Sequence, residues 1–262
     1  MIDLKNIPAL KKYKILLIGD SCIDQYYLGS CERLNPEAPV PILKILDNYK
    51  APGMASNVKE NLRALGGIID FITNKEKIYK KRYIDKRSGQ HLLRVDEEEK
   101  ITPWNGKLVS YMDYSQYDAI VISDYNKGFL HYEHIESVIK KSKSPVFIDT
   151  KKTDLARFEG AFIKINFLEY NRLTSEPLDK SKLIVTNGEH GAMCDLRHYP
   201  AKKVEIVDVC GAGDTFLSAL TIGCLNFENN IDKAIEFAII ASSLSVQHRG
   251  NYAPKLKEII NA

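Results

Sequence analysis

The sequence lacks long apolar runs, paired-cysteine motifs and any marked excess of one charge. No apolar segment approaches the ~20 residues that a membrane-spanning helix needs, and the N-terminal MIDLKNIPALKKYK lacks the apolar core of a secretion signal. The five cysteines are scattered, with neither a CxxC pair nor a histidine cluster beside them, which argues against a zinc site and a disulfide framework. These absences favour a soluble cytoplasmic protein with reduced thiols.

The charge balance gives no sign of a nucleic-acid partner. Lysine and arginine number 37 against 34 aspartate and glutamate residues, so the formal net charge is only +3. No internal repeat, low-complexity tract or Gly/Ser linker interrupts the 262 residues. We therefore expect one domain over residues 1–262, with neither nucleic acid nor a membrane as partner.

The order of the patterns predicts an α/β fold. The segment YKILLIGD (13–20) is a short apolar run typical of a buried parallel strand, and from residue 117 onward predicted strands alternate with helices. This alternation indicates a mainly parallel central sheet with helices on both faces. Segments near 39–48 and 76–96 predict strands of a small β lid. Helices are expected near residues 57–67, 131–142, 167–173, 212–226, 231–248 and 254–261.

The segment VDVCGAGDTFLSA (207–219) places Gly211, Ala212 and Gly213 directly before Asp214 at the start of a predicted helix. Small residues let an anion approach the N–H groups of a helix N-terminus, where the helix dipole is positive. A carboxylate would repel that anion, so Asp214 suits a group that brings a proton, such as an attacking hydroxyl. The pattern predicts phosphoryl transfer to an alcohol. The alternative is that the small residues only permit close packing and Asp214 caps the helix.

Two segments carry a family resemblance. DVCGAGDTFLSA resembles the C-terminal signature of the ribokinase-like (PfkB) carbohydrate kinases, and PGMASNVKENLRALG (52–66) is similar to their N-terminal signature. Gly53, Asn57 and Gly66 stand at the family spacing, and the two segments follow in the family's order about 150 residues apart. The resemblance implies a ribokinase-like fold with a β lid, and a sugar kinase that uses ATP and Mg²⁺.

The resemblance also assigns roles to particular residues. It makes Asp214 the base that deprotonates a sugar hydroxyl, while Gly211, Ala212 and Gly213 hold the transferring phosphoryl group. NFLEY is similar to the family's NxxE motif, which places Asn166 and Glu169 near Mg²⁺ and its waters; taken alone, the pair predicts a helix cap. The implied nucleotide contacts are Lys151, Asn166, Thr186, Gly188, Gly191 and Gly250.

For the substrate, the resemblance implies that Asp24, Gly53 and Asn57 bind the sugar. Segments 33–45, 91–99 and 123–130 resemble one subfamily, the D-glycero-D-manno-heptose 7-phosphate kinases that also form the first domain of a bifunctional heptose enzyme. This points to transfer onto the anomeric hydroxyl of that heptose phosphate, and to a homodimer closed by two lids. The substrate contacts implied by these segments are Arg33, Arg94, Asp124 and Lys127, of which the three cations suit the phosphate.

Some segments depart from the family pattern. Only IIDFITNKE (68–76) stands where relatives usually carry roughly forty more residues. Single differences are Met54, Asn126, Cys210, Ile239 and DTKK at 149–152. Two alternatives therefore stay open, a kinase for another sugar or nucleoside and a catalytically silent relative that binds sugar or nucleotide. A dinucleotide-binding dehydrogenase is excluded because LIGDSCID lacks GxGxxG.

Overall fold

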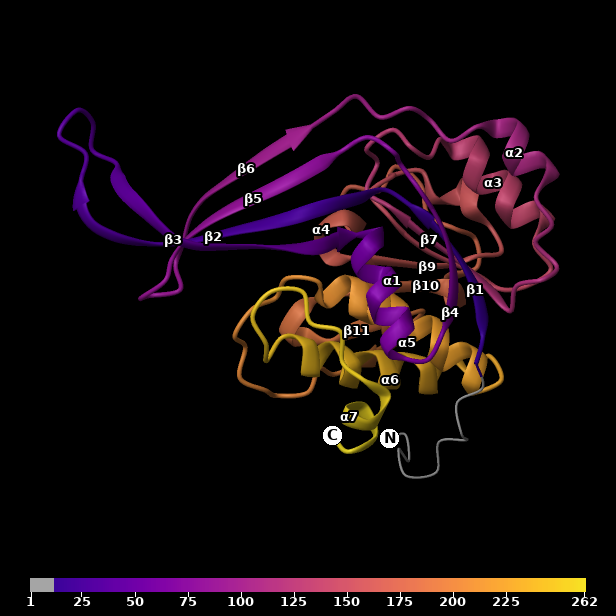
Figure 1. Cartoon of the computed structure of the whole chain (residues 1–262). Helices are drawn as coiled ribbons and strands as arrows, with labels where there is room; N and C mark the ends of the chain where they lie inside the picture. Colours follow the sequence, from indigo (N-terminus) through magenta and orange to yellow (C-terminus); the bar gives the residue numbers. More distant parts are fainter. Residues whose placement is uncertain (1–11) are drawn as a thin grey trace.

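The computed structural model describes residues 12–262, which form a large central sheet and a smaller sheet that reaches out to one side (Figure 1). The central sheet has the strand order β12-β11-β10-β9-β8-β7-β1-β4. Its strands pair in parallel except for β11 and β12, which pair antiparallel at one edge. The strands are β1 (Lys14–Gly19), β4 (Ile68–Thr73), β7 (Ala119–Asp124), β8 (Val146–Thr150), β9 (Phe162–Asn166), β10 (Leu183–Thr186), β11 (Ala192–Cys194) and β12 (Arg197–Tyr199).

Strand β1 shows why the central sheet is covered on both faces. Ile15 and Leu17 belong to one buried cluster, and Leu16 and Ile18 to another, because successive side chains of a strand point to opposite faces. The first cluster includes residues of α1, α5, α6 and α7, and the second includes residues of α2 and α3. The helices are α1 (Ala55–Ala64), α2 (Gly106–Tyr111), α3 (Tyr132–Lys141), α4 (Phe167–Tyr170), α5 (Ala212–Asn226), α6 (Ile231–Ser245) and α7 (Leu256–Ile260). The predicted mainly parallel α/β fold is confirmed.

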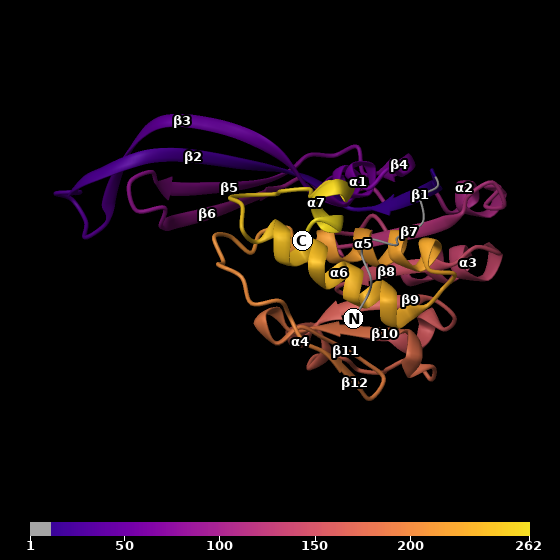
Figure 2. The same ribbon diagram turned by 90° about the horizontal axis from the view of Figure 1, so that it is seen from below.

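The smaller sheet, here called the lid, projects from the core in both views (Figures 1 and 2). It consists of β2 (Ser21–Leu34), β3 (Pro41–Met54), β5 (Ile78–Asp85) and β6 (His91–Glu98), in the order β3-β2-β5-β6. The strand expected near 39–48 runs on to Met54, and 76–96 contains two strands. Sequence analysis missed β2 because the buried positions of SCIDQYYLGSCERL include the polar Asp24, which hides the apolar alternation.

The register of the lid strands separates two faces. Tyr26 pairs with Tyr49 and stacks on it at 4.7 Å between ring centroids, on the face that also carries Asp24. On the opposite face, Tyr27 stacks on Tyr83 at 4.9 Å. Cross-strand aromatic pairs of this kind stabilise a sheet that has little other support.

Strand β4 forms the other edge of the central sheet, where the chain is short compared with the family pattern. It pairs only with β1, and Ile68 at its start is 51% exposed. The segment IIDFITNKE thus closes the sheet with a single strand. Over residues 12–262, the helices are too short or too polar to cross a lipid bilayer.

Candidate functional site

The candidate site lies where the carboxyl ends of the parallel strands meet the first turn of α5 and the base of the lid. At its centre is Asp214, which is only 5% exposed. The side-chain amide of Asn57 donates to Asp214 Oδ2 at 2.8 Å, and the hydroxyl of Tyr125 donates to Oδ1 at 2.9 Å. Both carboxylate oxygens are thus oriented by donors from separate segments, the start of α1 and the loop after β7.

The pKa of Asp214 is raised from its ordinary value of 3.8 to about 6, chiefly by burial and also by the nearby Asp149 carboxylate. The hydrogen bonds from Asn57 and Tyr125 and the charge of Lys164 act in the opposite direction. A carboxyl group with this pKa is ionised at neutral pH and is a stronger base than an exposed aspartate. It can therefore accept a proton from a hydroxyl group.

Gly211 caps the N-terminus of α5 with a left-handed backbone, φ 76°. A Cβ at this position would lie 2.7 Å from the Asn57 amide nitrogen and 2.9 Å from Asn251 Oδ1. Glycine is required here for two reasons, the positive φ and the close approach of two amide side chains. The small residue thus lets Asn57 reach Asp214.

Gly213 faces a cation. The Nζ of Lys164 would lie 2.9 Å from a Cβ built on Gly213, so its ammonium group sits against the first turn of α5. The backbone N–H groups there and this ammonium form one positive region suited to an anion. The N–H of Ala212 is not free, because it donates to the Val209 carbonyl at 3.3 Å. A ligand would have to displace this long hydrogen bond to use that amide.

Lys164 belongs to a buried chain of charges at the ends of β8 and β9. Its Nζ pairs with Asp149 Oδ2 at 2.7 Å, and both side chains are more than nine-tenths buried. Lys151 lies 3.9 Å from Asp149 Oδ1 and also pairs with Glu169. Cations and carboxylates alternate here, so each buried charge has a partner of opposite sign.

Asn166 and Glu169 form a reciprocal helix cap. Asn166 Oδ1 accepts from the Glu169 N–H, and Glu169 Oε2 accepts from the Asn166 N–H, both at 2.9 Å. This is the geometry expected from the cap reading of NFLEY. The second Glu169 oxygen pairs with Lys151, so the cap also holds a carboxylate beside the charge chain.

The lid side of the site is built around Asp24. Arg82 of β5 pairs with Asp24 Oδ1, and the Asn251 amide donates to Oδ2 at 2.9 Å. A Cβ on Gly53 would lie 2.3 Å from Asp24 Oδ2, so only glycine fits across from this carboxylate. Asp24, Gly53 and Asn57 therefore lie together, as the sequence predicts.

Of the three cations expected to read a substrate phosphate, Arg33 lies far from Asp24, whereas Arg94 and Lys127 both lie near the Asp96 carboxylate. Arg33 stands nine positions beyond Asp24 along β2, a path of roughly 30 Å at about 3.3 Å per residue. Arg94 makes two hydrogen bonds to Asp96 at 2.7 and 2.8 Å, and Lys127 pairs with Glu98. Two of the three charges are therefore already neutralised by carboxylates on the lid.

Asp124, also expected at the substrate, lies in a closed network instead. Its side chain is fully buried and accepts from Thr150 Oγ1 at 2.6 Å and from the Asn126 N–H at 3.0 Å. Lys152 pairs with it at 3.1 Å. The expected substrate contact of Asp124 stays a prediction, and in the structure the hydrogen-bonding capacity of this carboxylate is already used within the fold.

The residues expected at the nucleotide fall in two places. Thr186 ends β10, and Gly188 follows it with a positive φ and nothing within 4 Å of a built Cβ. Gly191 has φ 88°, and a Cβ there would lie 2.0 Å from the Tyr199 carbonyl. Gly250 lies on the lid side, with its N–H on Asp208 and the Tyr49 hydroxyl 3.7 Å from a built Cβ. A nucleotide role for Gly250 therefore lacks support from its surroundings.

Sequence analysis missed several residues of the site. Tyr125 lies within SDYNKGFL and Lys164 within FIKIN, yet neither segment shows locally that its side chain reaches α5. A lysine in the middle of an apolar strand is the one available signal, because such a charge is buried only with a partner. Arg82 and Asn251 give no such signal.

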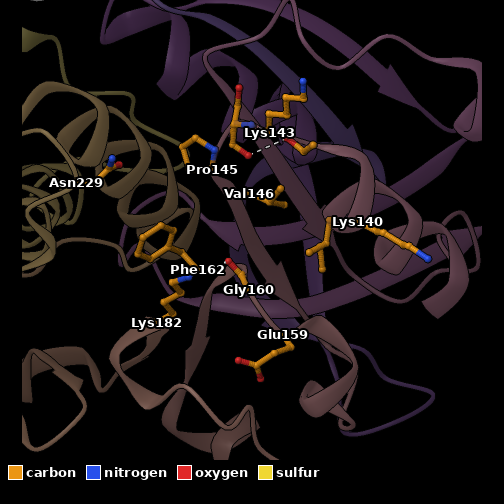
Figure 3. Close-up of a pocket in the computed structure, with 12 residues that line it drawn as sticks. Lys140, Lys143, Pro145, Val146, Glu159, Gly160, Phe162, Lys182 and Asn229 are labelled. Carbon is orange, nitrogen blue, oxygen red and sulfur yellow. Dashed lines mark hydrogen bonds between the residues drawn. The ribbon is translucent and has the colours of Figure 1, made fainter.

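Two surface pockets lie near or away from the site, and neither is lined by Asp214, Asn57 or Asp24. One, of about 440 Å³, lies between the inner face of the lid and the loop 206–209, and its lining includes Tyr26, Tyr49 and Arg249. The other, of about 610 Å³, is drawn in Figure 3 and is lined by Lys140, Val146, Phe162 and Lys182 among others. It lies near the starts of β8 and β9, the opposite ends from those that carry the candidate site, and none of the predicted site residues lines it.

Comparison with curated proteins finds bifunctional HldE proteins among the relatives. The chain is 30% identical to that of Vibrio cholerae serotype O1 (strain O395) over 98% of its own length, and 31% identical to that of a Nitratiruptor species over 95%. In both cases it spans 64% of the relative's length.

Solved structures share the fold at low sequence identity. Ribokinase from Thermotoga maritima superposes with a TM-score of 0.68 at 18% identity, covering 94% of this chain and 98% of the other. Phosphofructokinase-2 from Escherichia coli superposes with a TM-score of 0.71 at 15% identity, covering 95% of this chain and 97% of the other. The family model described as pfkB family carbohydrate kinase matches residues 113–258, which include the first turn of α5 and the charge chain. The chain therefore belongs to the pfkB family of carbohydrate kinases.

Proposed function

We propose that this sugar kinase transfers the γ-phosphoryl group of ATP to a hydroxyl of a sugar phosphate, and that the acceptor is the anomeric hydroxyl of D-glycero-D-manno-heptose 7-phosphate. The observation that carries the proposal is Asp214, a buried carboxylate with a pKa of about 6, held by Asn57 and Tyr125 beside the ammonium of Lys164. A proton acceptor next to a positive helix terminus is what the reaction requires.

In the proposed reaction, the sugar hydroxyl gives its proton to Asp214 while its oxygen forms the new bond to phosphorus. The bond between the γ-phosphorus and the bridging oxygen breaks, and ADP leaves. Lys164 and the first N–H groups of α5 stabilise the charge on the transferring group. Support for the nucleotide comes from the family, and the ribokinase from Arabidopsis thaliana, which superposes with a TM-score of 0.67, was solved with ribose and ATP.

The side chains at the ends of β8 and β9 fit Mg²⁺. Asp149 and Glu169 supply carboxylate oxygens, the ligand type that Mg²⁺ prefers, and Lys151 lies between them. Within residues 12–262 there is no cluster of three or more acidic, histidine or cysteine side chains arranged to hold a metal. Mg²⁺ in phosphoryl transfer usually keeps waters and substrate phosphates as ligands, so one or two carboxylates suffice. When bound, the ion would neutralise charge on the ATP phosphates.

For the sugar, we propose that Asp24 and Asn57 bind hydroxyl groups at the base of the lid. The substrate phosphate would then point along the inner face of β2 toward Arg249, which lies against Gly89 of the β5–β6 turn. Within the described part of the chain, Arg249 forms no ion pair.

The identity of the sugar rests on segments 33–45, 91–99 and 123–130, which resemble the heptose 7-phosphate kinases, and on the HldE relatives.

The lid also supports the proposal of a homodimer. Leu34, Ile45, Leu46 and Leu93 are each at least 46% exposed, and both outer lid strands have an unpaired edge. Sedimentation of the parent and of Leu46→Lys would test it, with a monomeric parent contradicting the dimer.

The proposal is tested by ADP release from ATP and Mg²⁺ with a panel of sugars, sugar 7-phosphates and nucleosides. We expect turnover with D-glycero-D-manno-heptose 7-phosphate, and a higher KM for it in Arg249→Ala than in the matched control Arg94→Ala. Turnover only with an unphosphorylated sugar or a nucleoside would contradict the substrate. Nucleotide binding in calorimetry without turnover on any acceptor would contradict the kinase activity and favour a silent relative.

A further inference from the structure

Tyr125 is the only tyrosine in residues 12–262 whose hydroxyl is bonded to the carboxylate of Asp214, and its surroundings fix it from several sides. The hydroxyl donates to Asp214 Oδ1 at 2.9 Å. Its backbone N–H donates at 2.8 Å to Oδ2 of Asp20, a fully buried residue at the point where β1 passes into the lid. The Nζ atoms of Lys80 and Lys151 lie 5.0 and 5.2 Å from its ring centroid. These contacts leave the side chain little freedom.

We propose that Tyr125 is a positioning residue that orients the Asp214 carboxylate and sets the pH range in which Asp214 accepts a proton. This inference rests on the proposed role of Asp214 as the base. Asn57 holds one carboxylate oxygen and Tyr125 the other, so the pair fixes the rotation of the carboxylate. An incoming hydroxyl then meets a lone pair in a defined direction, which is a condition for efficient proton transfer.

The tyrosine donates and does not itself lose its proton. Burial raises the pKa of Tyr125 well above its ordinary value of 10, and the Asp214 carboxylate raises it further. Its hydrogen bond stabilises the ionised form of Asp214, whereas burial and Asp149 favour the protonated form. Loss of the hydroxyl should thus make Asp214 harder to ionise.

Other groups also act on Asp214, and a variant that tests Tyr125 must leave these groups unchanged. These are the Asn57 amide on α1, the Cys22 thiol on β2, Asp149 on β8, Lys164 on β9 and the ammonium of Lys151. Cys22 stays protonated because burial raises its pKa to about 12. Tyr125→Phe leaves all of them in place and removes one donor.

The experiment measures kcat from pH 5 to 9 for the parent and for Tyr125→Phe. The matched control is Tyr117→Phe, since the Tyr117 hydroxyl also donates to a carboxylate, Asp70, at 2.9 Å but away from the site. We expect the acidic limb of the Tyr125→Phe profile to move to higher pH by about one unit, because a hydrogen bond to a charged group is worth about that much. The KM for the sugar should change little, and Tyr117→Phe should match the parent.

A second substitution tests the same idea with the opposite sign and without loss of the hydroxyl. Replacement of Tyr125 by 3-fluorotyrosine makes the phenol a stronger donor, so the acidic limb should move to lower pH. The inference would be overturned if the acidic limb of the kcat–pH profile stayed at the parent pH in both the Tyr125→Phe and the 3-fluorotyrosine variants. A fall in kcat by the same factor at every pH would also overturn it. If instead the Asp214→Asn variant phosphorylated the sugar at the parent rate, Asp214 would not be the base. This result distinguishes a failure of the proposed function from a failure of the inference about Tyr125.

Discussion

The side-chain amide of Asn57 donates to Oδ2 of Asp214 at 2.8 Å, joining the first turn of α1 to the first turn of α5. The two residues are 157 positions apart, one in each of the two family signatures. The two signatures thus contribute to one site, and the absence of a side chain at Gly211 leaves room for Asn57 to reach Asp214.

Asp214→Asn should lower kcat by about 10²–10⁴ while sugar and nucleotide still bind, because a positioned base contributes about that factor. The amide keeps the size of the side chain but cannot accept the proton. Steady-state ADP release gives kcat, and calorimetry gives the two affinities. Parent-like turnover in the variant would remove Asp214 from the reaction.

The pH dependence of the parent should follow the ionisation of Asp214. Its pKa is raised to about 6, so the carboxylate is the main form above pH 6 and the protonated form below it. We expect kcat to fall about tenfold per pH unit below 6 and to be flat above it. The measurement is kcat at saturating substrate in a constant-ionic-strength buffer. A limb near pH 4 would mean that an exposed carboxylate is the base.

Gly211→Ala should abolish most activity, because a Cβ there would clash with the Asn57 amide at 2.7 Å and pull it from Asp214. Gly66→Ala is the matched control. Gly66 also has a positive φ, 92°, but nothing lies within 4 Å of a built Cβ. The control should cost about 1 kcal/mol of stability through the backbone alone and keep its activity. Equal loss of activity in both variants would show that the clash is irrelevant.

Lys164→Met should destabilise the protein by about 3–5 kcal/mol, because it leaves Asp149 buried without its 2.7 Å partner. The double variant Lys164→Met with Asp149→Leu should recover much of that loss, since neither charge then remains buried alone. Urea unfolding of the parent, both single variants and the double variant measures the coupling free energy. Strictly additive effects would exclude a coupled pair. All three variants should lose activity.

Asp20→Asn should flatten the pH dependence of stability between pH 4 and 6. Burial and the Asp124 carboxylate raise the pKa of Asp20 to about 6. In that window the unfolded chain has released the proton and the folded chain keeps it, so the parent loses stability as pH rises, by about 3 kcal/mol from this group. Asn cannot ionise and shows no such loss. The test is to measure the free energy of unfolding of parent and variant at pH 4, 5, 6 and 7. A difference in this free energy that is the same at every pH would contradict the prediction.

The features of the candidate site that the sequence can indicate are those encoded by adjacent residues. The small residues before Asp214 and the glycine of segment 52–66 mark where bulk is excluded, and this follows from the sequence alone because the need for glycine is local. The position of Gly53 against Asp24 agrees with that interpretation.

The expected substrate contacts of Asp124 and Lys127 stay predictions, and the groups that pair with these two side chains in the fold come from elsewhere in the chain. Asp124 looks available in SDYNKGFL, but Lys152 and Thr150 arrive from the neighbouring strand β8 and its loop and close around it. Lys127 looks like a free cation, yet the course of the lid brings Glu98 to it, whereas Arg94 pairs with Asp96 two residues further along the same strand. A charge on a sequence segment says nothing about the charge that will face it.

The sequence by itself determined the family, the alternation that builds a parallel sheet, and the small-residue turn before Asp214, because each depends on short spacings between residues that are close in the sequence. Only the tertiary structure decided which charges are free. Parallel strands place their carboxyl ends at one edge whatever their separation in the chain, so Tyr125, Lys164 and Asn57 meet Asp214 there through burial and hydrogen bonding that no local pattern records.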